Sequence, residues 1–307
     1  MDEPINLWSQ QTSRPVHSVT IVNLFGGVQR IDYVDVDGVA VIEGDIAIGS
    51  VDEVARGKLH LPGVVPPAGT TPVTGAVTAP GATAPGTTAF TATSPASIPL
   101  PLRVGGRCAH PATSASITSD AFLWKAGRVP YALDAGLSQK ARDAVAAAIA
   151  DFHSQTCIRL SPRTTESDYL HIFPGGGCYS FLGRRGGRQN VSLGAGCEYK
   201  GIAMHELMHA LGFYHEHMRS DRDILLTINP GNIAPQYQSQ FIKLSSAQNR
   251  LYGDLDLASL MTYDNYAFSN NGQKTLEAKS GQVLIHGALK PGFSAGDVVG
   301  IRALYGC

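Results

Sequence analysis

The pattern of apolar and polar residues divides the chain into three parts. Between about residues 19 and 58, apolar and polar residues alternate, and an Asp37-Gly38 pair separates two strand-like runs, which indicates a small β-rich unit. The stretch from Leu61 to Leu102 contains no charged residue and is rich in Pro, Ala, Thr and Gly, a composition typical of a linker. Strand-like and helical patterns then return and continue to the last residue. We therefore expect three segments: residues 1–60, 61–112 and 113–307.

The third segment is predicted to mix strands with amphipathic helices. Strand-like stretches occur at residues 128–133, 169–173 and 190–193. One helix should begin after the N-cap Ser138, and another after Ser294, where Asp297 would complete the cap. Apolar residues recur at helical spacing in both: Ala141, Val145, Ile149 and Phe152 in the first, and Val298, Ile301 and Leu304 in the second.

The stretch HELMHALGFYH, which begins at His205, carries the strongest chemical signal. On a helix, His205 and His209 lie one turn apart and present their imidazoles on the same face. Gly212 can end the helix in the left-handed conformation, so that the chain turns back and brings His215 as a third ligand. Three protein ligands leave one position of a tetrahedral zinc ion open for water, as in catalytic zinc sites. Glu206 is close enough to act as general base on that water.

The alternative is a helix face that carries histidines by chance. A bare H-E-x-x-H arises in about one chain in a hundred of this composition, but the glycine and the third histidine at fixed offsets reduce that frequency by a factor on the order of hundreds. One constellation also explains all four residues at once. The sequence therefore favours a zinc peptidase.

Two motifs resemble those of a known family. The segment from His205 to Asp223, HELMHALGFYHEHMRSDRD, is similar to the active-site signature of the astacins, a branch of the metzincin zinc endopeptidases. Further on, SLMTY at residues 259–263 resembles the Met-turn of that family, with Thr262 where the family usually has histidine. The resemblance covers roughly residues 115–307.

The resemblance implies roles for single residues. Met261 would form an apolar floor under the metal, and Glu216 would anchor the mature N-terminus. Tyr263 would bind zinc in the resting enzyme and then stabilise the transition state. One zinc ion would activate a water, with Glu206 as general base, for the hydrolysis of a protein or peptide substrate.

The resemblance also implies a fold and an organisation. The fold class is α+β: a metzincin-type two-subdomain protease with a twisted N-terminal sheet, an active-site helix and an irregular C-terminal subdomain. A small β-rich prodomain would occupy residues 1–60, followed by a linker and activation region at 61–112 and the catalytic domain at 113–307. GGGCYS, at residues 175–180, would rim the cleft or be a plain surface loop tethered by a disulfide. We expect a monomer that is activated by another protease.

The five cysteines support a secreted protein. In the family pattern Cys157 pairs with Cys307 and Cys178 pairs with Cys197, which leaves Cys108 over. Such bridges persist in oxidising compartments, and a second metal site is the weaker alternative because no C-x-x-C spacing occurs. The N-terminal residues lack the basic-then-apolar pattern of a secretory signal, so the export route stays open.

Two residues are candidates for a latency switch. IEGDI, at residues 42–46, resembles the astacin propeptide segment whose aspartate occupies the open zinc position, which would make Asp45 the switch; the alternative is that Gly44-Asp45 is merely a turn. Cys108 is the competing candidate, because a thiolate is an excellent zinc ligand. Activation would require cleavage between Arg103 and about Ala115.

Charge and hydropathy exclude other classes of partner. The net charge is −1, which gives no argument for binding to nucleic acid, and no apolar run approaches the length of a membrane-spanning helix. The rival hypothesis is a catalytically inactive, zinc-containing module that binds peptides. It is disfavoured because no ligand and no base is lost, and because a structural zinc would take four protein ligands.

Overall fold

The computed structural model describes residues 14–22, 28–42, 44–56, 59 and 114–307. All of these residues belong to one compact unit of the chain. Cys108 and the region from Arg103 to residue 113, where activation cleavage is expected, lie outside the described residues.

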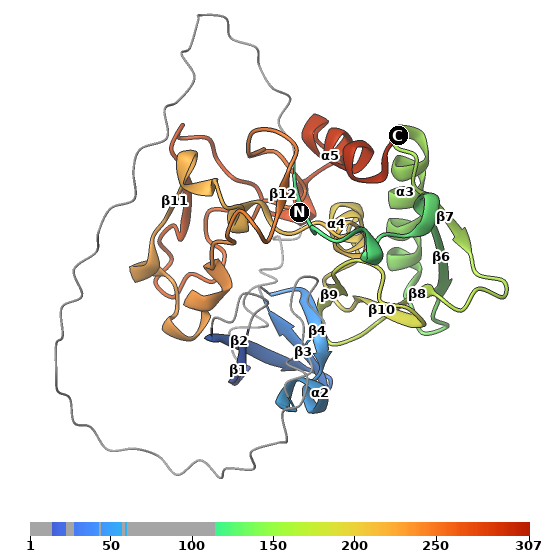
Figure 1. The fold of residues 1–307 in the computed structure, drawn as a ribbon, viewed down its shortest axis with the longest axis horizontal. Coiled ribbons are helices and arrows are strands. Elements are labelled where there is room, and N and C mark those ends of the chain that lie inside the picture. The colour runs from blue at the N-terminus through green and yellow to red at the C-terminus, as the bar shows by residue number, and fades with distance from the viewer. Residues whose placement is uncertain (1–13, 23–27, 43, 57–58, 60–113) are drawn as a thin grey trace, which may run out of the picture. The chain divides into compact units, whose positions relative to one another are not determined.

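Strands from the N-terminal part and from the middle of the chain form one nine-stranded sheet (Figure 1). The N-terminal strands are β1 (Val16–Val22), β2 (Val28–Val36), β3 (Val39–Ile42) and β4 (Ile46–Ser50). The later strands are β6 (Arg128–Leu133), β7 (Arg159–Pro162), β8 (Tyr169–Phe173), β9 (Cys178–Phe181) and β10 (Arg188–Leu193). The strand order is β1-β2-β3-β4-β9-β10-β8-β6-β7.

Local chemistry explains the N-terminal strands. Successive strands from β1 to β4 pair antiparallel. Asp37 and Gly38 both have positive φ, 53° and 81°, which suits the right-handed twist of a tight hairpin between β2 and β3. The amide of Gly38 donates to Asp35 Oδ1 at 2.7 Å. The turn predicted at Asp37-Gly38 is therefore confirmed.

The helices are α2 (Val51–Ala55), α3 (Gln139–Gln155), α4 (Lys200–Leu211) and α5 (Ala295–Tyr305). Both predicted N-caps are confirmed: the hydroxyl of Ser138 accepts from the amide of Ala141, and Ser294 forms a capping box with Asp297. The strands predicted at residues 128–133 and 169–173 have those bounds, and the strand predicted from residue 190 begins two residues earlier. The mixture of strands and helices confirms the α+β class.

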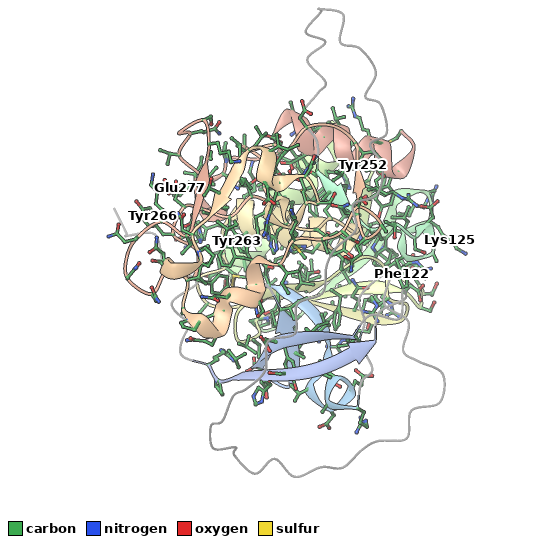
Figure 2. All side chains as sticks on the ribbon, turned by 60° about the vertical axis from the view of Figure 1, so that its left-hand side comes forward. Phe122, Lys125, Tyr252, Tyr263, Tyr266 and Glu277 are labelled. Atoms are coloured by element: carbon green, nitrogen blue, oxygen red, sulfur yellow. A yellow bond between two sulfur atoms is a disulfide. The ribbon has the colours of Figure 1, made fainter. Side chains whose placement is uncertain are left out.

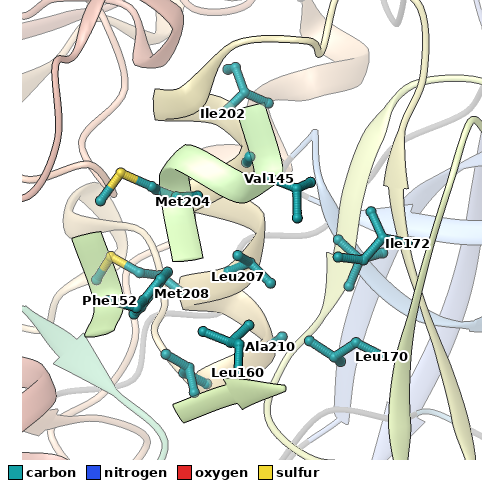
Figure 3. Packing of buried hydrophobic residues seen from close by; sticks show 14 of the residues in the cluster. Val145, Phe152, Leu160, Leu170, Ile172, Ile202, Met204, Leu207, Met208 and Ala210 are labelled. Atoms are coloured by element: carbon teal, nitrogen blue, oxygen red, sulfur yellow. The ribbon is translucent and has the colours of Figure 1, made fainter. Parts of the chain in front are cut away.

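Helices α3 and α4 pack on the sheet and form the largest apolar core (Figure 3). Val145 and Phe152 come from α3, Ile172 from β8, and Leu207 and Met208 from α4, and all five are buried. Burying side chains of this size contributes about 1.5–3 kcal/mol each. This core fixes the position of α4, which carries the predicted zinc ligands.

The chain after α4 consists mainly of short elements, and three more short elements precede β6. Two small ladders join β11 (Leu226–Ile228) to β13 (Leu276–Ala278) and β12 (Arg250–Leu251) to β5 (Ala115–Ser116). Short 3-10 turns are η1 (Asp120–Phe122), η2 (Lys125–Gly127), η3 (Glu216–Met218), η4 (Arg222–Ile224), η5 (Pro230–Asn232), η6 (Pro235–Phe241) and η7 (Gly287–Leu289). In Figure 2, Tyr266 and Glu277 mark the irregular part after α4, while Phe122 of η1 and Lys125 of η2 lie on the opposite side of the view. None of the helices in the described ranges has both the length and the apolar character that crossing a membrane requires.

Candidate active site

Helix α4 and the turn that ends it place the three predicted ligands. His205 and His209 lie one turn apart on α4, and both are buried. Gly212 ends the helix with a φ of 106°, in the left-handed region, and a Cβ there would lie 2.7 Å from Ile117 Cδ1. The chain then turns back to His215, which is also buried. Glycine is required at position 212 for two reasons, its conformation and the space around it.

The ring nitrogens of the three histidines converge on one point. His205 Nε2 lies 3.1 Å from His209 Nε2 and 3.2 Å from His215 Nε2. Ligands held at zinc–nitrogen distances of 2.0–2.1 Å in a tetrahedron are separated by about 3.3–3.4 Å. The spacing of these nitrogens therefore matches a tetrahedral zinc ion.

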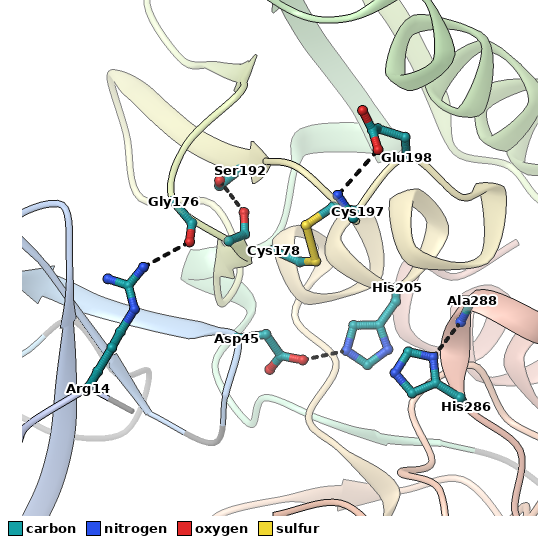
Figure 4. Close-up of a disulfide and its surroundings, with 12 residues drawn as sticks. Arg14, Asp45, Gly176, Cys178, Ser192, Cys197, Glu198, His205, His286 and Ala288 are labelled. Carbon is teal, nitrogen blue, oxygen red and sulfur yellow. Dashed lines mark hydrogen bonds and ion pairs between the residues drawn. A yellow bond between two sulfur atoms is a disulfide. The ribbon is translucent and has the colours of Figure 1, made fainter. Parts of the chain in front are cut away.

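Asp45 completes the donor set, as Figure 4 shows. One carboxylate oxygen lies 3.0 Å from His205 Nε2, and the other lies 3.3 Å from His209 Nε2 and 3.1 Å from His215 Nε2. The chain reaches this point through a turn at Gly44, whose φ is 84°, and the carbonyl of Asp45 accepts from the amide of Ser180 at 2.8 Å. The structure thus brings Asp45 to the three histidines, which lie 160 to 170 residues away along the chain.

Hydrogen bonds to carbonyl groups set the tautomers of two histidines. Nδ1 of His205 lies 2.8 Å from the carbonyl of Leu260, and Nδ1 of His209 lies 2.8 Å from the carbonyl of Phe213. A carbonyl can only accept, so each Nδ1 donates its proton, and the neutral form of each ring has its lone pair on Nε2. Burial lowers the pKa of His209, and it lowers the pKa of His215 to about 3, although Asp45 opposes both shifts.

This donor set fits zinc. Neutral imidazoles and a carboxylate are ligands that zinc prefers. Their lone pairs face one another in a buried place, which is unfavourable unless a cation lies between them.

Glu206 lies beside the donor set. Its side chain is 1% exposed, and within the described part of the chain its Oε2 has no hydrogen-bond partner. Burial, and then the negative charge of Asp45, raise the pKa of Glu206 well above its usual value. A carboxyl group with a raised pKa and an open oxygen can accept and return a proton.

A cleft opens beside the donor set. Figure 4 shows the Cys178–Cys197 disulfide and His286 near His205 at this place. The lining includes Gly176, Cys178, Ile202, Glu206, Tyr263 and His286. GGGCYS therefore contributes to the rim, but its last three residues belong to strand β9, so the alternative of a plain surface loop is wrong.

The predicted Met-turn lies under His205. Met261 is fully buried, and the carbonyl of the preceding Leu260 orients His205. The ring of Tyr263 lies 4.4 Å from the ring of His215 and 4.1 Å from the ring of His217, between ring centroids. Tyr263, which was also predicted as a zinc ligand, thus has its ring next to the donor set. The donor set itself consists of the three histidine nitrogens and the carboxylate of Asp45.

Two buried residues with ionisable side chains, Asp297 and Lys290, form hydrogen bonds with the Met-turn. Asp297 accepts from the hydroxyl of Ser259 at 2.6 Å and from the amide of Leu260 at 3.0 Å. The ammonium of Lys290 donates to the carbonyls of Ser259 and Thr262, at 2.6 Å each. Sequence reasoning named Asp297 only as a helix cap and missed Lys290, because nothing local marks a lysine that folds against a turn 28 residues away.

Glu216 follows His215 in the chain and is fully buried. One carboxylate oxygen accepts from the amide of Ala115 at 3.1 Å, and the other accepts from the amide of Asp256 at 3.2 Å. Burial raises the pKa of Glu216 to about 8, and the nearby Arg219 opposes that shift. Glu216 therefore holds the start of the described catalytic segment against the Met-turn region.

Both predicted disulfides are present. Cys157 is bonded to Cys307, which ties the end of α3 to the end of α5. Cys178 is bonded to Cys197, which ties the first residue of β9 to the segment before α4.

Comparison with known proteins assigns the chain to a family. The model of the Astacin peptidase family matches residues 116–306. Among curated proteins, zinc metalloproteinase nas-15 of Caenorhabditis elegans is 43% identical over 187 residues, which are 60% of this chain and 32% of that protein. Zinc metalloproteinase nas-13 of the same organism is 44% identical over 186 residues, 60% of this chain and 41% of that protein.

Solved structures agree. High choriolytic enzyme 1, a hatching enzyme zinc-protease from the medaka fish Oryzias latipes, is 36% identical, with a TM-score of 0.59. The match covers 64% of this chain and 100% of that one. This chain spans about a third to two fifths of the length of the two nematode proteins named above. The chain therefore belongs to the astacin family of peptidases.

Proposed function

We propose that this protein is a zinc metalloendopeptidase that is made as a latent zymogen. The observation that carries the proposal is the convergence of three histidine nitrogens on one point, beside a buried glutamate, in a chain of the astacin family. His205, His209 and His215 would hold a single zinc ion. Bound there, zinc would polarise the scissile carbonyl and lower the pKa of a bound water to about 7.

The protein's own groups would move the proton and stabilise charge. Glu206 would accept the proton of the attacking water and deliver it to the nitrogen of the leaving amine. The phenol of Tyr263 would donate a hydrogen bond to the oxyanion that develops on the scissile carbonyl. Met261 would keep the floor of the site apolar and rigid.

Latency would come from the N-terminal part. With residues 1–60 as prodomain, 61–112 as linker and activation region and 113–307 as catalytic domain, the carboxylate of Asp45 would take the position that water needs. The placement of Asp45 among the histidine nitrogens supports it over Cys108 as the switch. Cleavage next to Ala115 would create an ammonium group beside Glu216, whose carboxylate already accepts from the amide of Ala115.

Secretion and a monomeric state are part of the proposal. Two disulfides within the catalytic part support an oxidising compartment outside the cytoplasm. The substrate would be a protein or peptide, and activation would need another protease. Nothing in the net charge of −1 supports nucleic acid as a partner.

Hydrolysis of an internally quenched fluorescent peptide tests the proposal. The full chain is digested until residues 1–113 are degraded, as judged by mass spectrometry, and is then assayed with and without a zinc chelator. We expect activity that the chelator abolishes and that zinc restores. The Glu206→Gln variant, which keeps the size and buried position of the side chain, should bind zinc normally and be at least about a thousandfold slower.

The rival function is that of an inactive, zinc-containing peptide-binding module. It would be supported by a protein that binds zinc after the same digestion, and hydrolyses no peptide in a broad library. To test the switch, uncut Asp45→Ala and uncut Cys108→Ala are compared with the uncut parent chain. A faster reaction with Asp45→Ala alone supports Asp45, and a faster reaction with Cys108→Ala alone supports Cys108.

A further inference from the structure

The N-terminal strands contact the catalytic part through the backbone of the sheet. β4 pairs in parallel with β9, with Ile46 opposite Ser180 and Ala47 opposite Phe181. β9 is therefore hydrogen-bonded on both sides, to β10 and to β4. This contact depends on main-chain groups, so it does not require the covalent link between the two parts.

Both faces of the N-terminal strands are buried in cores that they share with the catalytic part. On one face, Val34, Val36 and Val41 pack in a cluster with Tyr237 and Phe268. A second cluster covers the other face. Its N-terminal members are Ile31, Ile42, Ile46, Ile48 and Val54. Its members from the catalytic part are Ala115, Ile117, Leu182, Tyr214 and Met218. Separation of the two parts would expose all of these apolar side chains to water, which is unfavourable in proportion to the apolar area exposed.

Polar contacts surround these cores. The guanidinium of Arg14 donates to the carbonyls of Asp35 and Gly176, at 3.0 Å each, so it joins the prodomain to the glycine loop before β9 (Figure 4). Tyr237 donates its hydroxyl to the carbonyl of Arg14 at 3.3 Å, and Gln240 donates its side-chain amide to the carbonyl of Asp32 at 3.3 Å.

We propose that residues 14–59 form an inhibitor that stays bound after the linker is cut, so that activation needs a second step that removes it. This inference rests on the proposed latency and goes beyond it. All the contacts named above come from residues 14–54, on the N-terminal side of the linker. A cut in the linker removes the high effective concentration that the tether provides. It leaves the backbone pairing, the shared cores and the Asp45 carboxylate in place.

The docking surface of this inhibitor consists of β9, the glycine loop before it and the apolar side chains around Tyr237 and Met218. Its occupant is the chain's own N-terminal domain, acting as a separate polypeptide once it has been cut. Proteolysis within residues 14–59 would destroy the inhibitor and complete activation. The linker cut and the loss of inhibition are then two separate events.

Limited digestion with elastase tests the inference on the full chain. Elastase cuts after small side chains, which the segment 61–102 has in abundance, and mass spectrometry identifies the conditions under which only this segment is cut. The cut protein is run on gel filtration at micromolar concentration and assayed with a fluorescent peptide. We expect both fragments to elute together, with less than about a tenth of the activity seen after residues 1–113 are degraded. Separate elution, with full activity on cutting, would overturn the proposal.

Matched arginine variants extend the test. Arg14→Ala removes the contact with Gly176, whereas Arg56→Ala removes an exposed arginine from the end of α2 in the same domain. The cut Arg14→Ala protein should lose its N-terminal fragment about ten times faster than the cut parent, measured by dilution and rebinding, while Arg56→Ala should match the parent. Equal rates for all three proteins would contradict the assigned surface.

The readouts keep this inference separate from the proposed enzymatic function. Co-elution of the two fragments is measured without any peptide substrate. The result therefore tests the inhibitor even if the protein hydrolyses no peptide. Absence of activity after complete degradation of residues 1–113 would count against the peptidase. Loss of co-elution after the linker cut would count against the inhibitor alone.

Discussion

Lys290 shows how a single residue can act on the site without lying next to the donor atoms. Burial lowers the pKa of its ammonium to about 8, although four acidic groups nearby, Asp297 first among them, oppose the shift. The ammonium holds the carbonyls on either side of Leu260, whose own carbonyl orients His205. Removal of a group that orients a metal ligand through hydrogen bonds typically changes the metal affinity by 10–100-fold.

Lys290→Met should weaken zinc binding and the fold together. Methionine fills the same space but leaves the buried carbonyl of Thr262 without its donor, whereas the carbonyl of Ser259 still accepts from the amide of Thr262 at 3.1 Å. The unsatisfied carbonyl costs about 1–3 kcal/mol of unfolding free energy. We expect the dissociation constant for zinc, measured by competition with a chromophoric chelator, to rise about 10–100-fold. Lys125→Met, at an exposed lysine, is the control and should change neither quantity. An unchanged zinc affinity in Lys290→Met would show that the Met-turn does not depend on this ammonium.

Asp168 gives a prediction that depends on pH. The amide of Gly187 and the guanidinium of Arg184 donate to its carboxylate, and together with Ser167 they lower its pKa from the usual value despite some desolvation. A carboxylate with a lowered folded-state pKa stabilises the fold above its unfolded pKa of about 3.9 and loses that contribution as the pH falls through the folded value.

Asp168→Asn keeps an acceptor for Gly187 but removes the charge that pairs with Arg184. The pair is partly exposed, so after allowance for solvent screening we expect a loss of about 1 kcal/mol at pH 7. Urea unfolding of parent and variant at pH 7, 5 and 3 measures it. The difference should shrink as the pH falls below about 4, and a difference that stays constant down to pH 3 would show that charge is not its cause.

At the scale of elements, the sequence predicted those strands and helix caps that depend on neighbouring residues in the chain. The strands at residues 128–133 and 169–173 and the caps at Ser138 and Ser294 depend on neighbouring residues, and the structure has them where the sequence places them. β9 was not predicted as a strand, because CYSF follows three glycines and becomes a strand only through its partners β10 and β4.

The residues of the candidate site also divide into those that local sequence predicts and those that it does not. Three histidines and a glutamate were predicted from helical spacing, because one helix and one turn place all of them. Asp45 was predicted from resemblance alone, and Lys290 was not predicted, since both reach the site through long-range folding. No local pattern encodes a contact between residues 45 and 205.

Helix α4 approaches the segment around η7 so closely that only glycine fits at position 201. A Cβ at Gly201 would collide with the carbonyl of Gly287 and would lie 2.8 Å from the carbonyl of Lys290, both of which are backbone groups. Gly201→Ala should therefore destabilise the protein by about 1–3 kcal/mol, even though alanine favours helices by up to about 1 kcal/mol.

Gly300→Ala in helix α5 is the matched control for that substitution. The nearest atoms to a Cβ at Gly300 are 3.4 Å away, at ordinary contact distance, so helix propensity should dominate. Thermal unfolding should show a lower Tm for Gly201→Ala and an equal or higher Tm for Gly300→Ala. Equal effects of the two substitutions would contradict the close approach of α4 to η7.

For the whole molecule, the Cys157–Cys307 bond should be the larger contributor of the two disulfides. It closes a loop of 150 residues, against 19 for Cys178–Cys197. The chain-entropy model gives about 5 kcal/mol for the first loop and about 3 kcal/mol for the second. Denaturant unfolding of the double variants Cys157→Ala/Cys307→Ala and Cys178→Ala/Cys197→Ala measures both losses. A larger loss from the second pair would mean that effects in the folded state outweigh loop closure.

The position of β9 in the strand order bears on solubility as well as on latency. With β4 in place, β9 is an interior strand; once the N-terminal strands leave, it becomes an edge strand with unpaired main-chain groups. Exposed edges invite pairing with other molecules, and a short edge limits that hazard. β9 has only four residues, so it would form a short edge if the proposed activation removes the N-terminal strands. We therefore expect the form that retains its prodomain to tolerate high concentration best, and the activated form to aggregate first.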